Sequence, residues 1–176
     1  MITNRLIFPI WMMFIVPISW AAIIPGTFLI ALFALLIALS AAHSQGADGA
    51  PMPAAGRLRA AWADARRSIW RAWISVCAAY LAGTAAMLLP SLFAIGRDEG
   101  SYIVQMSTAL LENPYASAHA LVWTCMSVIL SAAIARNLAL SWILNKTSRP
   151  KDKRAALWFA ILTAPYLFLS TYKLFY

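Results

Sequence analysis

Six arginines carry the chemistry that is easiest to recognise in this sequence. Five of them lie in the stretch 57–73 (RLRAAWADARRSIWRAW), together with three tryptophans and a single acid, Asp64. Guanidinium groups bind phosphate through several N–H donors, and a basic helix with aromatic anchors is typical of a surface that contacts anionic lipid. We predict contacts with acidic phospholipid or a partner for Arg57, Arg59, Arg66, Arg67, Arg71 and Arg136.

The stretch 57–73 has two sides when it is drawn as a helix with 3.6 residues per turn. The apolar side carries Leu58, Trp62, Ala65, Ile69, Trp73 and Val76. The polar side carries Arg57, Asp64, Arg67 and Arg71, with Arg59 and Arg66 at the boundary beside Trp70. A simpler interpretation is that the stretch extends a membrane span into the cytoplasm and is basic for topological reasons alone. The sequence leaves both interpretations open.

The composition identifies lipid as the solvent of this chain. The 176 residues are 62% hydrophobic and 11% charged, with a mean hydropathy of +0.73. Globular proteins average about 45–50% apolar and about 25% charged residues, so a soluble domain of this length could not bury the excess. The net charge of +8 is confined to short segments between apolar runs. This pattern is typical of membrane topology, and we expect no direct binding of nucleic acid.

We predict an all-α fold, a polytopic membrane bundle of about five transmembrane helices. The first apolar run, 6–42, is too long for one span, and Pro25-Gly26 at its centre predicts a tight hairpin. A re-entrant first segment, which would leave four spans, is the alternative. A cleaved secretory signal ending near 42–45 is a second alternative, but the run far exceeds the usual 7–15 apolar residues. The predicted spans are 6–24, 27–42, 74–89, 118–135 and 155–172.

We treat residues 1–176 as a single membrane domain. Pro90 is expected to end the third span, and the outer loop is expected to hold a short apolar stretch at 102–111 and a turn at 113–115. The parts in order are an apolar hairpin (1–44), a linker (45–56), the basic helix continuing into a span (57–95), an outer loop (96–119), a span (118–145), a basic loop (145–154) and a last span (155–176).

Positive charge sets the predicted orientation. Arg5, the five arginines of the basic stretch and the five Lys and Arg residues of the 146–154 loop collect on one face. Only Arg97 and Lys173 fall on the other. The positive-inside rule assigns the basic face to the cytoplasm of a bacterial inner membrane. We therefore expect the amino terminus inside and the carboxyl terminus in the periplasm.

Small residues recur at four-residue spacing in the third and fourth predicted spans. This spacing lets the backbones of membrane helices approach closely. We favour packing within the chain, and a face for another subunit is the alternative. The predicted packing residues are Ala78, Ala82, Gly83, Ala86, Ser131, Ala135 and Ala139.

The remaining reactive side chains do not combine into a catalytic or metal site. Cys77 and Cys125 are expected at different depths, which excludes a disulfide and argues against a disulfide-generating enzyme. His43 and His119 are expected at opposite faces and cannot share a metal. Arg136 has no acid partner in any predicted span, so we expect it to reach the lipid phosphates at the inner end of the fourth. We predict no enzymatic activity, no metal and no cofactor other than a bound acidic phospholipid.

The layout resembles the small polytopic inner-membrane subunits of conjugative type IV secretion systems, the TraQ type of IncI conjugation and related Dot/Icm subunits. The long apolar start (LIFPIWMMFIVPISWAAIIPGTFLIALFALLIALSAA), the basic RLRAAWADARRSIWRAW helix, the two further spans and the length carry this resemblance. It implies a non-enzymatic structural subunit of a transfer machine, whose partners are lipid, other envelope subunits or copies of itself. A self-assembling pilin-like subunit with bound phospholipid is one alternative. A small transporter, pore-forming toxin or immunity protein is another, and no small-molecule substrate is identified.

Overall fold

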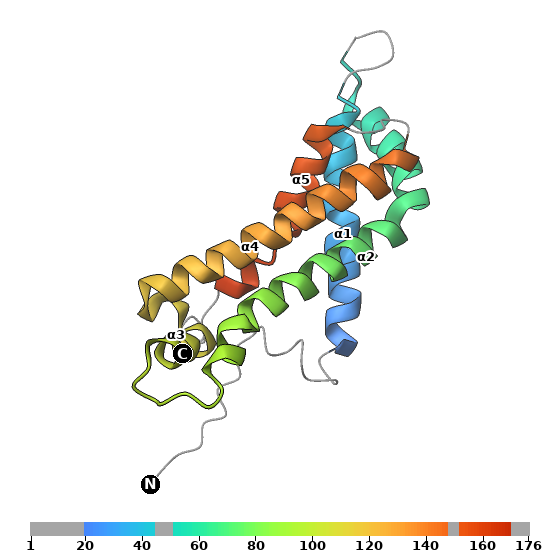
Figure 1. The fold of residues 1–176 in the computed structure, drawn as a ribbon. Coiled ribbons are helices and arrows are strands. Elements are labelled where there is room, and N and C mark those ends of the chain that lie inside the picture. Colours follow the sequence, from blue (N-terminus) through green and yellow to red (C-terminus); the bar gives the residue numbers. More distant parts are fainter. Residues whose placement is uncertain (1–19, 45–50, 148–151, 170–176) are drawn as a thin grey trace. The chain divides into compact units, whose positions relative to one another are not determined.

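The computed structural model describes residues 20–44, 51–147 and 152–169, and this part of the chain is helical without a β-strand. The prediction of an all-α fold is confirmed for these residues. The elements are α1 (Trp20–Ala42), α2 (Ala54–Ala94), α3 (Tyr102–Glu112), η3 (Pro114–Ala116), α4 (Ala118–Leu138), η4 (Ala139–Ile143), η5 (Leu144–Lys146), α5 (Lys153–Thr163) and η6 (Tyr166–Leu169) (Figure 1). η4 is a π-helix, and η3, η5 and η6 are 3₁₀-helices.

Three helices are long and apolar enough to cross a membrane: Ile23–Ala42, Ala54–Ala94 and Ala118–Lys146. The described part of the chain thus holds three candidate membrane spans, which supports a membrane protein, and five spans were expected. Most of the first expected span, 6–24, lies outside the described residues. Of the two spans that a break at Pro25-Gly26 was predicted to separate, only the second, 27–42, is described in full.

The last predicted span, 155–172, does not form one helix. α5 has 11 residues, about 16 Å of helix, which is too short for a hydrocarbon core of about 30 Å. It ends because Ala164 precedes Pro165, and a residue before proline is pushed out of the helical region; Ala164 is extended, with φ −60° and ψ 141°. Residues 170–176 lie outside the described part.

Two prolines that were expected to end helices lie inside them. The predicted hairpin at Pro25-Gly26 is wrong, because α1 continues through both residues. Pro25 is only the sixth residue of α1, so its missing N–H costs one hydrogen bond near the helix start. The Thr27 hydroxyl donates to the Ile24 carbonyl at 3.1 Å in the same turn. Pro90 likewise lies within α2, which continues to Ala94.

The chain divides into two compact units, which we describe separately. The loop unit contains residues 81–130 and 165–169 together with the start of α1, and the basic unit contains residues 24–80 and 131–164. Helices α2 and α4 each contribute residues to both units. The predicted single domain is thus built from two groups of contacts.

The loop unit holds the hydrophilic connection between α2 and α4. The predicted apolar stretch forms α3, and the predicted turn forms η3, where the Asn113 side chain accepts from the Tyr115 N–H at 3.2 Å. The Trp123 indole N–H donates to the Ala86 carbonyl at 2.9 Å and joins α4 to α2. Gly96 follows α2 with a positive φ of 75°, which allows the chain to turn away from the helix end.

Small residues bring the helices of the basic unit together. Ala79 of α2, Ala135 of α4 and Ala160 of α5 form one buried cluster, each at most 3% exposed. The Ser131 hydroxyl donates to the Ala79 carbonyl at 2.8 Å, which is an interhelical bond to the backbone itself. Small side chains allow this approach because they keep nothing bulky between the two backbones. Larger buried side chains complete the core of this unit: Leu35, Leu39, Ile143, Leu144 and Phe159.

Candidate lipid and partner surface of the basic unit

The first half of α2 buries a narrow face of mostly small residues. The predicted apolar side is divided between interior and surface, because Leu58 and Trp62 are exposed while Ala65 and Val76 are buried. Alanine and serine face the interior, and tryptophan and arginine face outward. The buried face consists of Ala61, Asp64, Ala65, Ser68, Ala72, Ser75, Val76 and Ala79, and the exposed face includes Leu58, Arg59, Trp62, Arg66, Arg67, Trp70 and Ile74.

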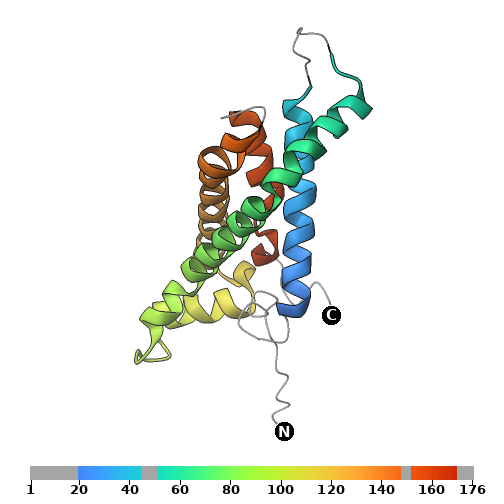
Figure 2. The same ribbon diagram turned by 90° about the vertical axis from the view of Figure 1, so that its right-hand side faces the viewer.

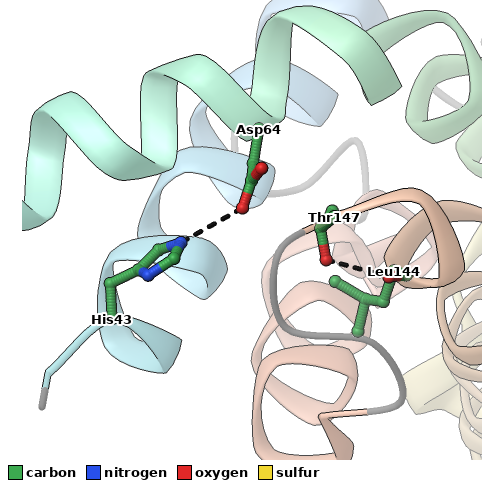
Figure 3. Close-up of polar contacts among 4 residues, drawn as sticks. All are labelled: His43, Asp64, Leu144 and Thr147. Atoms are coloured by element: carbon green, nitrogen blue, oxygen red, sulfur yellow. Dashed lines mark hydrogen bonds and ion pairs between the residues drawn. The ribbon is translucent and has the colours of Figure 1, made fainter. Parts of the chain in front are cut away.

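Asp64 was expected on the exposed polar side, and the structure buries it. Its carboxylate Oδ2 lies 3.1 Å from Nε2 of His43, which follows the last turn of α1 (Figure 3). Each of the two side chains is only 7% exposed. The single acid of the basic stretch is therefore engaged in the contact between α1 and α2, and it does not neutralise the exposed arginines. The position of Asp64 between Ala61 and Ala65 was the sequence signal, but its partner 21 residues away could not be inferred.

A second contact joins α1 and α2 at an aromatic cluster. The Trp73 indole N–H donates to the Thr27 hydroxyl at 3.1 Å. The Phe28 ring packs against Trp70 in a tilted orientation and against Trp73 edge-on, with ring centroids 5.7 and 6.4 Å apart. From Thr27 to the His43–Asp64 pair is about 24 Å along α1 but only about 14 Å along α2, so the helices cross at an angle (Figure 2).

Arg66 and Arg67 lie between these two contacts and are both exposed. No hydrogen bond or ion pair engages either guanidinium within the described part of the chain. Trp70, 62% exposed, stands beside them. Exposed guanidinium groups next to indole rings are the arrangement that a membrane interface containing anionic lipid favours.

Arg71 is held within the protein, unlike Arg66 and Arg67. Its Nη1 donates to the Trp142 carbonyl at 3.4 Å, and its guanidinium carbon lies 5.9 Å from the centre of the Trp142 ring. Trp142 belongs to the π-helix η4 at the carboxyl end of α4. Carbonyls at a helix end lack partners within the helix and carry partial negative charge, so a cation is stabilised there. Arg71 therefore secures the end of α4 and is a poorer candidate for a lipid headgroup than predicted.

The same helix end is capped by a threonine. The Thr147 hydroxyl donates to the Leu144 carbonyl at 2.8 Å, which closes η5 (Figure 3). Arg136 lies half-buried in the last turn of α4, close to the predicted inner end of the span. Arg59 is exposed near the start of α2, and Arg57 is half-buried, with no hydrogen-bond partner at its buried Nε atom within the described residues.

The predicted packing residues occupy several environments. Ser131, Ala135 and Ala139 of α4 are each 1% exposed. In α2, Gly83 is buried and Ala82 and Ala86 are half-buried, but Ala78 is exposed. The α2 residue that packs against α4 and α5 in the basic unit is Ala79, which belongs to the second small-residue series, beside that of Ala78.

The other reactive side chains lie apart. Cys77 and Cys125 are free thiols. His119 stacks edge-on against Tyr102 with ring centroids 5.4 Å apart. Within the described residues, no three His, Cys, Asp or Glu side chains gather into a group that could hold a metal.

Comparison with known proteins finds no matching family model and no significant match among curated proteins or solved structures. The resemblance to secretion-system subunits therefore stays a prediction, which depends on the order and chemistry of the segments.

Proposed function

We propose that this chain is a non-enzymatic structural subunit of a multiprotein assembly in a bacterial inner membrane. The supporting observation is the partition of its side chains. Alanine and serine fill the contacts between helices, while large apolar residues point outward, among them Phe33 (60% exposed), Leu81 (58%) and Ile129 (61%). Such a surface needs lipid or a neighbouring subunit to cover it.

The assembly that we propose is a conjugative DNA-transfer machine of the type IV secretion class. The basic helix that continues into a span, the polar loop and the further apolar helix all occur in the order that suggested this class. In this proposal the exposed apolar faces contact other subunits, and the basic-aromatic face of α2 contacts anionic lipid or a cytoplasmic component.

The proposed topology follows from the ends of the spanning helices. Apart from Arg97 in the α2–α4 connection, the described Lys and Arg residues lie in the first half of α2, at the carboxyl end of α4 and its 3₁₀ extension, and at the amino end of α5. If α1, α2 and α4 each cross once, these ends share one side, and the positive-inside rule makes it cytoplasmic. The α2–α4 connection is then periplasmic, and so is the amino end of α1. The expected amino terminus inside and carboxyl terminus outside would each need one further crossing, before α1 and after α4.

Thiol labelling in intact cells tests this topology. In a variant whose native cysteines are replaced by alanine, Gly100→Cys should react with an impermeant maleimide, and Asn145→Cys should react only after permeabilisation. The reverse pattern would overturn the orientation.

The lipid contact of the basic helix is tested with Arg66→Ala/Arg67→Ala. Each charge near an anionic surface contributes about 1 kcal/mol, so binding to vesicles rich in phosphatidylglycerol should weaken about fivefold per charge. Arg97→Ala, in the polar loop, is the matched control and should bind as the wild type does. Unchanged binding of the double variant would exclude lipid as the target of this face.

The assembly role is tested by gentle detergent extraction of the tagged full-length chain from its native host, followed by sizing and mass spectrometry. A large complex of reproducible membrane proteins supports the proposal. A homopolymeric filament would indicate the pilin-like alternative, and a lone small oligomer would overturn both. A tagged inner-membrane protein of similar size and unrelated role serves as the control for non-specific recovery.

A further inference from the structure

An apolar groove lies between α1 and the start of α2, inside the basic unit. Its volume is about 620 Å³, within the range of about 300–1,000 Å³ typical of ligand sites. Phe33, Ile37 and Leu58 in its walls are 60%, 50% and 56% exposed, so they are open to a ligand or to lipid. The residues that line it are Phe33, Leu36, Ile37, Ser40, Ala41, Leu58 and Arg57.

Among the described residues of this lining, Arg57 alone is charged. Its Nε atom is buried, yet it donates to no acceptor in the described part of the chain, and no ion pair involves the guanidinium there. A buried donor without a partner is unfavourable, and a cation beside hydrocarbon is more so. The groove therefore has a hydrocarbon-lined body and a cationic group that lacks its anion.

No acid in the described lining competes for Arg57. The nearest acid along α2 is Asp64, two turns away, and its carboxylate is engaged by His43 at 3.1 Å. An anion brought to Arg57 would thus meet an attractive charge without a compensating carboxylate among these residues.

We propose that this groove binds one anionic phospholipid, with an acyl chain along the apolar wall of α1 and the phosphate on the Arg57 guanidinium. A phosphodiester supplies acceptor oxygens for the Nε–H and Nη–H donors of Arg57. The acyl chain covers the exposed side chains of Phe33 and Ile37. Ser40 offers a hydroxyl in the same lining. This site goes beyond the proposed assembly role, because it needs no partner protein and involves a different arginine from the exposed Arg66 and Arg67.

The test is native mass spectrometry of the full-length chain in mild detergent, titrated with phosphatidylglycerol and, separately, with phosphatidylcholine. We expect the wild type to bind one phosphatidylglycerol with clear preference over phosphatidylcholine. Arg57→Gln should weaken phosphatidylglycerol binding about fivefold and remove the headgroup preference. Arg97→Gln removes the same charge in the polar α2–α4 loop, outside the groove lining and outside the basic face of α2, and should bind as the wild type does.

A second pair of variants tests the acyl-chain part of the site. Ala41→Trp places a large ring in the groove and should abolish retention of the lipid. Ala63→Trp makes the same change at an exposed α2 position outside the lining and should leave binding intact. Circular dichroism of all four variants confirms that they fold.

Four outcomes would overturn the proposal. Equal phosphatidylglycerol binding by the wild type and Arg57→Gln would show that Arg57 does not contact the headgroup. Equal loss in Arg57→Gln and Arg97→Gln would indicate a diffuse charge effect. A wild type that binds no phosphatidylglycerol, with Ala41→Trp destabilised, would show that a segment of the chain itself fills the groove. Competition by inorganic phosphate alone at the lipid concentration would likewise exclude a phospholipid as the specific occupant.

Discussion

Replacing Ala79 by leucine should destabilise the basic unit far more than the same replacement one residue earlier. Ala79 is 1% exposed and packs against Ala135 and Ala160, which are 1% and 3% exposed. Its carbonyl also accepts the Ser131 hydroxyl at 2.8 Å. Three added carbon atoms have no space where α2, α4 and α5 meet, so the helices must separate.

The expected cost follows from these two contacts. Overpacking of a well-packed interior costs about 1–3 kcal/mol. Separation of α2 from α4 also breaks the Ser131 hydrogen bond, and interhelical bonds in membrane proteins average about 0.6 kcal/mol. The free energy of unfolding should therefore fall by about 2–4 kcal/mol for Ala79→Leu.

Ala78→Leu is the matched control. Ala78 is exposed on the neighbouring position of α2, and alanine and leucine both favour helix, so the change should stay within about 0.5 kcal/mol. Reversible unfolding by SDS titration in mixed micelles, followed by tryptophan fluorescence, measures both variants. Equal stability of the two, or a larger loss for Ala78→Leu, would refute the packing described for the basic unit.

Three further predictions use the same unfolding titration. Asp64→Ala leaves His43 without its buried partner and should cost about 1–3 kcal/mol, whereas Asp64→Asn keeps a hydrogen-bonding side chain and should cost less; equal costs would contradict a hydrogen-bonded pair. A double-mutant cycle with Arg71→Gln and Trp142→Leu should give a coupling of about 0.5–1 kcal/mol, and zero coupling would show that the ring contact is without effect. Gly96→Ala should cost about 1 kcal/mol because φ is 75° while the space around it is open; an unchanged stability would exclude that backbone conformation.

The sequence was sufficient for the elements that depend on local chemistry. The basic stretch continues into an apolar helix as predicted, because nothing between Arg57 and Leu89 interrupts a helical pattern. Asn113-Pro114 forms a turn, because an asparagine side chain accepts from a backbone N–H two residues later and proline cannot continue the preceding helix.

Helix ends at proline were predicted less well. Pro25 lies near the start of α1, where little hydrogen bonding is lost, and the Ala86 carbonyl that Pro90 leaves without a backbone donor accepts the Trp123 indole N–H. Pro165 follows α5 and ends it. The residue type is the same in each case, and its position in the helix together with the partners available to the freed carbonyl decides the outcome.

The details of the candidate site depend on segments far apart in the chain. Ala78 and Ala79 each begin a series of small residues at four-residue spacing, and the two series look equivalent in the sequence. Only the contacts from other helices, the Ser131 hydroxyl and Ala160, show that Ala79 is the interface residue. Asp64 and His43 pair across 21 residues, and Arg71 reaches a carbonyl 71 residues away. No local pattern encodes such pairings.

The small-residue contact between α2, α4 and α5 has a consequence for how this chain can change over time. At Ala79, Ala135 or Ala160, a single extra methylene collides with a neighbouring helix, so these positions with small side chains should accept almost no replacement. At Phe33, Leu81 or Ile129, one bulky apolar side chain can exchange for another against fluid hydrocarbon at little cost. A saturation mutational scan should thus invert the familiar pattern of a water-soluble protein: the largest residues should be the most interchangeable, and the smallest should be the most restricted.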